Sequence, residues 1–172
     1  MFSIVVDAMI TKLFRYLFNK RSEIDRLNFN DVLLTKLVLD IHRKRTGSRF
    51  EKVKLHSIEP VHPIDRESAR AVVLERVKAL NVRRDEILRT RLVDRHLLAS
   101  FLPSISWIKV VRCGDERFVS FEGNGRIEAL QRVFDMSDGI DVEAEVYYFK
   151  DMTKILRRIN RVRRHYGVTA VA

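Results

Sequence analysis

The sequence predicts an α+β fold in which a small mixed sheet carries helices on one side, with a helical N-terminal extension and a basic C-terminal helix added to it. Residues 107–149 show the pattern strand, strand, glycine-rich turn, helix and strand. Residues 53–60 and 65–80 add another strand followed by a helix. The 172 residues, 46% of them apolar, suffice for one domain with a substantial core. We therefore expect three parts: the extension in residues 1–48, the core in 49–150, and the basic helix and tail in 151–172.

The central pattern begins with a hairpin. Residues 107–112 and 117–121 are rich in β-branched and aromatic side chains, and a four-residue loop that contains Gly114 separates them. A helix should follow, because apolar side chains then recur at helical spacing. They are Ile127, Leu130, Val133 and Phe134. Residues 137–139 should end this helix, and residues 142–149 should return as a strand.

Two more helices are predicted between the opening strand and the hairpin. The first covers residues 65–80, with Asp65 as its cap and Pro63 stopping the strand before it. The second covers residues 94–102 and should stop before Pro103. We expect both helices to cover one face of the sheet.

The N-terminal extension is predicted to form a docking hairpin of two helices. The first covers residues 4–18, where charged residues interrupt an apolar pattern. The second begins at Asn30 as N-cap, with Phe29 as a hydrophobic staple, and ends at Gly47. Its expected buried face consists of Val32, Leu33, Leu37, Val38 and Ile41. No stretch approaches the roughly 20 uncharged apolar residues of a membrane span, so we expect no transmembrane segment.

The net charge of +10 is unevenly distributed along the chain. Residues 51–149 hold 16 bases and 17 acids, whereas residues 150–172 hold 7 bases and 1 acid. Residues 151–166 place apolar side chains at helical spacing and bases elsewhere, which predicts one packed face and one cationic face. The bases assigned to the cationic face are Lys154, Arg157, Arg158, Arg161, Arg163 and Arg164. Such a face suits a nucleic acid, an anionic membrane or an acidic protein, with a merely solvated surface as the alternative.

The most specific motif is the turn Glu-Gly-Asn-Gly-Arg at residues 122–126, between the predicted strand and helix. Its glycines let the backbone approach an anion, the positive end of the helix favours that anion, and the arginine can clamp it. The predicted phosphate-binding residues are Gly123, Asn124, Gly125 and Arg126. A turn that only requires positive φ values explains the glycines as well.

This order of elements resembles the ParB and sulfiredoxin superfamily over about residues 50–150. In that superfamily, a similar turn ending in arginine holds nucleotide phosphates. The resemblance implies that the turn binds a nucleotide such as ATP or CTP, with Mg²⁺ entering only together with it. It also implies catalytic or metal-linked roles for Glu122 and, after the opening strand, for Glu59. Asn124 stands at the position of the sulfiredoxin cysteine, which excludes peroxiredoxin repair.

Other interpretations compete for the same residues. The Fic motif of nucleotidyl-transferring enzymes is similar, but its catalytic histidine position is Phe118 in this chain and its loop joins two helices. A degenerate Fic-type protein is therefore one alternative. For Glu59, the simpler interpretation is an exposed glutamate at the end of a strand, before Pro60.

Two function classes follow from these patterns. The first is a ParB-like phosphate or nucleotide-binding domain, and whether it also performs phosphoryl transfer or nucleotide hydrolysis is left open. The second is a non-catalytic assembly or nucleic-acid-associated subunit, part of a larger complex, that docks through its basic helices or binds an acidic protein. The histidine spacing predicts no metal site of the protein itself. A single cysteine, Cys113, suits a reducing compartment, so we expect a cytoplasmic protein, with an organelle matrix as the alternative.

Overall fold

The computed structural model describes residues 29–102 and 106–171. The chain divides into two compact units, residues 1–36 and 37–172, and the features below belong to the second unit. The helix expected over residues 4–18 lies outside the described residues. Among the described residues, no helix combines the length and the apolar character needed to cross a membrane.

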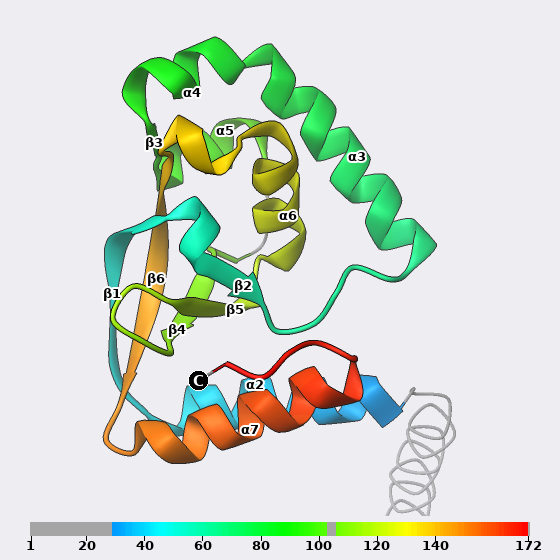
Figure 1. Cartoon of the computed structure of the whole chain (residues 1–172), viewed down its shortest axis with the longest axis vertical. Helices are drawn as coiled ribbons and strands as arrows, with labels where there is room; N and C mark the ends of the chain where they lie inside the picture. The colour runs from blue at the N-terminus through cyan, green and yellow to red at the C-terminus, as the bar shows by residue number, and fades with distance from the viewer. Residues whose placement is uncertain (1–28, 103–105, 172) are drawn as a thin grey trace, which may run out of the picture. The chain divides into compact units, whose positions relative to one another are not determined.

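The described part of the chain contains one mixed sheet of six strands (Figure 1). Its order is β1-β6-β4-β5-β2, with the short β3 also paired to β6. Antiparallel pairs join β1 to β6 and β4 to β5, and parallel pairs join β4 to β6, β3 to β6 and β2 to β5. The strands are β1 (Arg45–Lys54), β2 (Ile58–Pro60), β3 (Leu92–Val93), β4 (Lys109–Arg112), β5 (Phe118–Glu122) and β6 (Asp141–Phe149). The α+β class and the mixed sheet are thereby confirmed.

Six α-helices accompany the sheet within the described residues. They are α2 (Phe29–Lys44), α3 (Glu67–Val82), α4 (Arg84–Thr90), α5 (Arg95–Phe101), α6 (Asn124–Val133) and α7 (Met152–His165). Two 3₁₀ turns, η1 (Leu55–Ser57) and η2 (Met136–Asp138), complete the elements. Figure 1 shows α3, α4, α5 and α6 gathered together, with β6 running from this group to α7. Helix α3 packs mainly against α6. The expectation that it covers a face of the sheet together with the helix over residues 94–102 is therefore incomplete, because α6 lies among the elements that α3 contacts.

The core lies between the sheet and the group of four helices. Residues from α3, α4, α5 and α6 form one buried cluster with residues from the strands. The predicted inner face of α6 is confirmed, because Ile127, Leu130 and Phe134 are almost fully buried. Burying a leucine or isoleucine side chain of this kind stabilises the fold by about 2 kcal/mol. The hairpin of β4 and β5 and the strand β6 also lie where the sequence predicts them.

The opening strand differs from its prediction. The expected single strand over residues 53–60 is split into the end of β1, the turn η1 and the short β2. The reason is topological: β1 pairs with β6 at one edge of the sheet, whereas β2 pairs with β5 at the other edge. The chain must therefore leave the sheet at η1, where the Leu55 N–H donates to the Ile140 carbonyl at 2.9 Å.

Helix boundaries supply three further corrections. Helix α2 ends at Lys44, and Gly47 lies in β1 beside a register irregularity instead of ending the helix. Helix α3 has Arg66, not Asp65, at its N-cap position. The sequence analysis also missed α4 and β3. Arg91 ends α4 with φ 52°, a left-handed conformation that glycine or asparagine usually marks.

The apolar face of α7 agrees with its prediction. Ile155, Ile159 and Val162 are buried, and Asp151 caps the helix by accepting a hydrogen bond from the Lys154 N–H at 3.0 Å. Arg163, however, was wrongly assigned to the cationic face, because it is buried. The predicted inner face of α2 is confirmed at Leu37 and Ile41, which are both buried, but it was wrong at Val32, which is exposed.

Candidate functional site

The turn at residues 123–126 joins β5 to α6 and requires glycine at its first position. Gly123 has φ 88° and is the N-cap of α6. A Cβ atom there would lie 3.0 Å from Cγ1 and 3.1 Å from Cα of Ile108, so the space is closed as well. The Gly123 carbonyl accepts hydrogen bonds from the N–H groups of Arg126 and Ile127. Within the described residues, the N–H groups of Asn124 and Gly125 have no acceptor, which leaves two donors at the positive end of the helix.

Two arginines meet beside this turn. Arg126 is 2% exposed, and its Nη2 donates to the Ser106 carbonyl at 2.5 Å. Arg76 reaches the same place from α3 across Gly125, where an added Cβ would lie 2.7 Å from Arg76 Nη1. Burial, followed by the positive charge of Arg76, lowers the pKa of Arg126 to about 10, and the carboxylate of Glu122 partly opposes this. Arg76 itself has no hydrogen bond or ion pair within the described residues, and burial lowers its pKa. The result is a local excess of positive charge.

Asn124 contributes its backbone to the turn and not its side chain. The side chain is buried, and its Oδ1 accepts a hydrogen bond from the Ser120 hydroxyl at 2.6 Å. This contact ties the start of α6 back to β5. Asn124 therefore fixes the shape of the turn, and only its N–H group is available to a ligand.

Glu122 lies directly before the turn, and the side chains of Lys109, His42 and Ser106 hold its carboxylate. Its Oε2 lies 2.7 Å from Lys109 Nζ, and its Oε1 lies 3.3 Å from His42 Nε2. Arg45 Nη1 donates to His42 Nδ1 at 2.9 Å, so the ring proton that faces Glu122 is on Nε2. Burial raises the pKa of Glu122, but hydrogen bonds and charge from Lys109, with smaller help from His42, outweigh burial and lower it. A carboxylate held in this way is a weak general base.

Glu59 occupies a different environment from Glu122. It pairs in register with Val119 of β5, three residues before Glu122. Its two oxygens accept hydrogen bonds from Arg117 Nη2 at 2.8 Å and from Arg163 Nη2 at 2.6 Å. Burial raises the pKa of Glu59, while the hydrogen bond from Arg117 and the charge of Arg163 together lower it below the ordinary value. The structure therefore gives each predicted carboxylate its own cations and does not join the two in one site.

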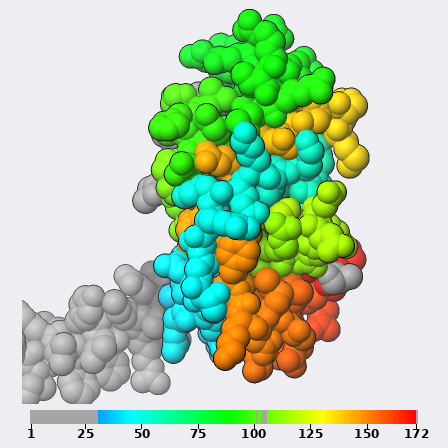
Figure 2. Space-filling view, turned by 90° about the vertical axis from the view of Figure 1, so that its left-hand side faces the viewer, coloured from blue at the N-terminus to red at the C-terminus, as the bar shows by residue number. Residues whose placement is uncertain are grey.

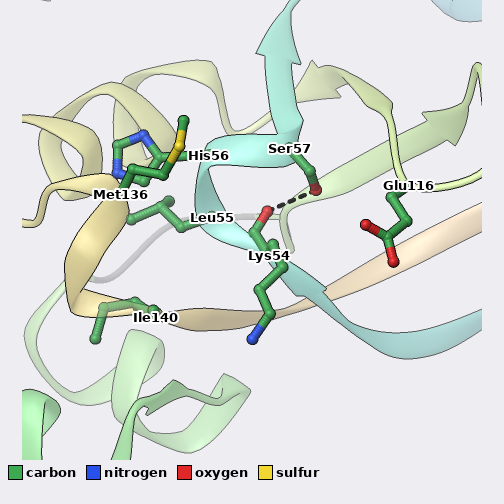
Figure 3. Close-up of a pocket in the computed structure, with 8 residues that line it drawn as sticks. Lys54, Leu55, His56, Ser57, Glu116, Met136 and Ile140 are labelled. Carbon is green, nitrogen blue, oxygen red and sulfur yellow. Dashed lines mark hydrogen bonds between the residues drawn. The ribbon is translucent and has the colours of Figure 1, made fainter.

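Two hollows lie at the opposite end of β5 from the turn, and Figure 3 shows the first of them. Their volumes are about 260 and 340 Å³, and they share Lys54, Ser57 and Glu116. Figure 3 shows His56 and Met136 together on one side and Ser57 and Glu116 on the other. Charges of both signs line the hollows, and no residue of the turn belongs to either. They therefore do not form part of the candidate phosphate site.

Sequence reasoning missed two residues that now complete the site. Arg76 carries the second positive charge at the turn, and His42 contacts Glu122 from α2. A signal for Arg76 was present, since it stands among apolar residues of the inner stripe of α3, where a base is unusual. No local pattern reveals His42, because it lies 80 residues from Glu122 in the sequence.

Comparison with known proteins does not assign this chain to a family. No family model, curated protein sequence or solved structure matches the chain. Among the described residues, no group of three or more histidine, cysteine, aspartate or glutamate side chains is arranged to hold a metal ion. The turn joins a strand, β5, to a helix, α6, whereas the loop of a Fic protein joins two helices. This difference disfavours the Fic alternative. The function must therefore be argued from the geometry of the turn.

Proposed function

We propose that the turn at residues 123–126, together with Arg76, binds a phosphate group of a nucleotide such as ATP or CTP. The observation that carries this proposal is the meeting of Arg76 and Arg126 at the positive end of α6. A buried positive charge is costly unless an anion or several acceptors surround it. Among the described residues, Arg126 has one carbonyl acceptor, and a second arginine is its neighbour. A phosphate would accept hydrogen bonds from both guanidinium groups and from the two free N–H groups of the turn.

Arg76 and Gly125 are both partly exposed, whereas Arg126 is buried. In this proposal a phosphate contacts Arg76 and the N–H groups of the turn from the exposed side of Gly125. The order of β5, turn, α6 and β6 supports the proposal that this unit is a ParB and sulfiredoxin-like core.

We assign binding to the turn and give Glu122 a supporting role. Its carboxylate is engaged with Lys109 and His42, and its pKa is lowered, so proton abstraction by Glu122 is disfavoured. In this proposal Glu122 keeps Lys109 beside the turn, where its positive charge adds to that of the arginines. Mg²⁺ would enter with the nucleotide, since its usual carriers are substrate phosphates.

Calorimetric titration with ATP, CTP and inorganic phosphate, with and without Mg²⁺, tests the proposal at about 150 mM salt, where exposed charges are screened. We expect binding that Arg126→Ala and Arg76→Ala each weaken by about 10-fold or more, because each removes a charge-assisted hydrogen bond. The matched control is Arg132→Ala. It removes an exposed arginine near the other end of α6, where Arg132 pairs with Glu128 at 2.6 Å. Equal affinity of wild type and Arg126→Ala would refute a phosphate site at the turn.

Glu122→Gln separates binding from catalysis. The amide keeps the shape of the side chain but lacks its negative charge, so we expect phosphate binding to persist or to tighten. If the protein hydrolyses nucleotide and Glu122→Gln abolishes only hydrolysis, the carboxylate is catalytic and our supporting role for it is wrong.

A further inference from the structure

A second anionic ligand is indicated by a row of exposed bases on α7. We propose that this row binds the phosphate backbone of duplex nucleic acid. The residues, called here the α7 stripe, are Lys150, Lys154, Arg157, Arg161 and Arg164. All five are exposed. Lys150 precedes α7, and the other four, spaced three, four and three residues apart, lie along one face of the helix. At 1.5 Å per residue, this helical part of the stripe is about 15 Å long.

The stripe is only partly engaged by the protein itself: Lys154 pairs with the exposed Asp151 at 2.9 Å, and Arg164 Nε donates to the Asn160 carbonyl at 3.3 Å. Within the described residues, Arg157 and Arg161 have no hydrogen bond or ion pair. Arg158 instead pairs with Asp40 of α2, and Arg163 is buried against Glu59. The arginines of α7 thus divide into two that anchor the helix and three that face outward with Lys150 and Lys154.

The helix that carries the stripe is fixed before any ligand binds. Ile155, Ile159 and Val162 anchor it in the core. Asn160 accepts a hydrogen bond from the Val171 N–H at 2.9 Å and donates one to the Val171 carbonyl at 2.8 Å, which ties down the residues after α7. A rigid row of charges loses little conformational entropy on binding.

The packing of α7 favours nucleic acid over a membrane. A membrane-surface helix inserts its apolar face into the lipid, but the apolar face of α7 is already buried in the protein. A duplex carries one negative charge per about 1.7 Å of its axis, which supplies a dense row of partners along the stripe. The stripe has no aromatic residue on which bases could stack, so single strands are disfavoured relative to a duplex.

Further bases extend this surface. Arg43 and Lys44 are exposed at the end of α2, one turn beyond Asp40, which contacts α7. Figure 2 shows the start of α7, in orange, at the surface beside the cyan part of the chain, where α2 passes directly into β1. The phosphate turn takes no part in this surface, so the inference stands independently of the proposed function.

The test measures binding of the full chain to 20-base-pair RNA and DNA duplexes by fluorescence anisotropy over a range of salt. We expect Arg157→Ala/Arg161→Ala to weaken duplex binding about 10-fold. It should also reduce the slope of log K against log salt by about 1.8, because each lost phosphate contact contributes about 0.9 for a DNA duplex. The RNA and DNA arms show which duplex is preferred. Nucleotide binding should be unchanged in this variant.

The matched control is Lys78→Ala/Arg83→Ala, which removes the same number of exposed positive charges at the end of α3. Duplex affinity and salt slope should remain those of wild type. Three results would overturn the proposal. These are equal weakening by both double variants, no effect of the stripe variant, or tighter binding to single strands, poly-glutamate or phosphatidylserine vesicles than to duplexes.

Discussion

Arg126 and Arg163 are equally buried, each 2% exposed, but their surroundings differ sharply. Arg163 donates to Glu59 Oε2 at 2.6 Å and to the carbonyls of Pro60 and Thr169, both at 2.7 Å. Within residues 29–102 and 106–171, Arg126 donates to one carbonyl, and it lies near a second arginine. A buried charge is stable in a fold when anions and acceptors surround it. We therefore interpret Arg163 as a structural residue and Arg126 as half of a site that a ligand completes.

The largest expected effect concerns the contribution of Arg163 to stability. Arg163→Ala should lower the free energy of unfolding by about 3 kcal/mol, because one oxygen of the Glu59 carboxylate and two carbonyls then lose their donor. Urea denaturation measures this loss. As a control, Arg164→Ala removes an exposed neighbour and should change stability by less than about 0.5 kcal/mol. Similar losses in both variants would contradict the structural role of Arg163.

The next effect concerns the backbone of the turn. Gly123→Ala should cost about 2 kcal/mol, because alanine is strained at φ 88° and its Cβ would crowd Ile108. Gly139 offers a matched position, with φ 64° and open space around it. Gly139→Ala should therefore cost only about 1 kcal/mol. If thermal denaturation shows equal losses, the close approach of Ile108 does not constrain the turn.

A pH dependence tests the pairing of Glu59 with Arg163. Because the pKa of Glu59 is below its ordinary value of 4.5 in the fold, its ion pairs stabilise the protein above pH 4.5. That contribution is lost as the pH falls through the lower, folded pKa. Below pH 4.5, the free energy of unfolding should therefore fall more steeply for wild type than for Glu59→Gln. Because Glu59 is partly exposed, this difference should be smaller than the stability cost of Gly123→Ala. Parallel acid-unfolding curves would show that Glu59 is not coupled to folding.

The smallest effect on stability is expected at Gly125. In Gly125→Ala the new Cβ meets only the flexible end of Arg76, which can move, so stability should change by less than about 1 kcal/mol. Phosphate binding should nevertheless weaken, because Arg76 is displaced from the turn. A variant that binds phosphate like wild type would remove Arg76 from the site.

Local sequence patterns predicted much of the fold. The hairpin of β4 and β5, the strand β6 and the helices α6 and α7 all follow from alternation and helical spacing within short windows. The split of residues 53–60 could not be predicted in this way. It depends on which strands β1 and β2 pair with, and those partners lie far away in the sequence.

The candidate site was predictable only in part. The turn itself was visible as glycines followed by Arg126, and its role in phosphate binding stays a prediction. The burial of Arg163 was missed because helical spacing alone does not reveal that Glu59, 104 residues away, lies beside it. For the same reason, the sequence could not show that Glu59 and Glu122 are each held by separate cations.

The most direct test of the comparison is the free energy of unfolding of wild type and Arg126→Met, each with and without ATP and Mg²⁺. Without ligand, Arg126→Met should lie within about 1 kcal/mol of wild type, since it loses one hydrogen bond but relieves the repulsion from Arg76. ATP at about 100 times its dissociation constant should stabilise wild type by about 2.7 kcal/mol and leave the variant nearly unchanged. A loss of several kcal/mol without ligand, with equal stabilisation of both proteins by ATP, would make Arg126 a structural residue like Arg163 and contradict this account.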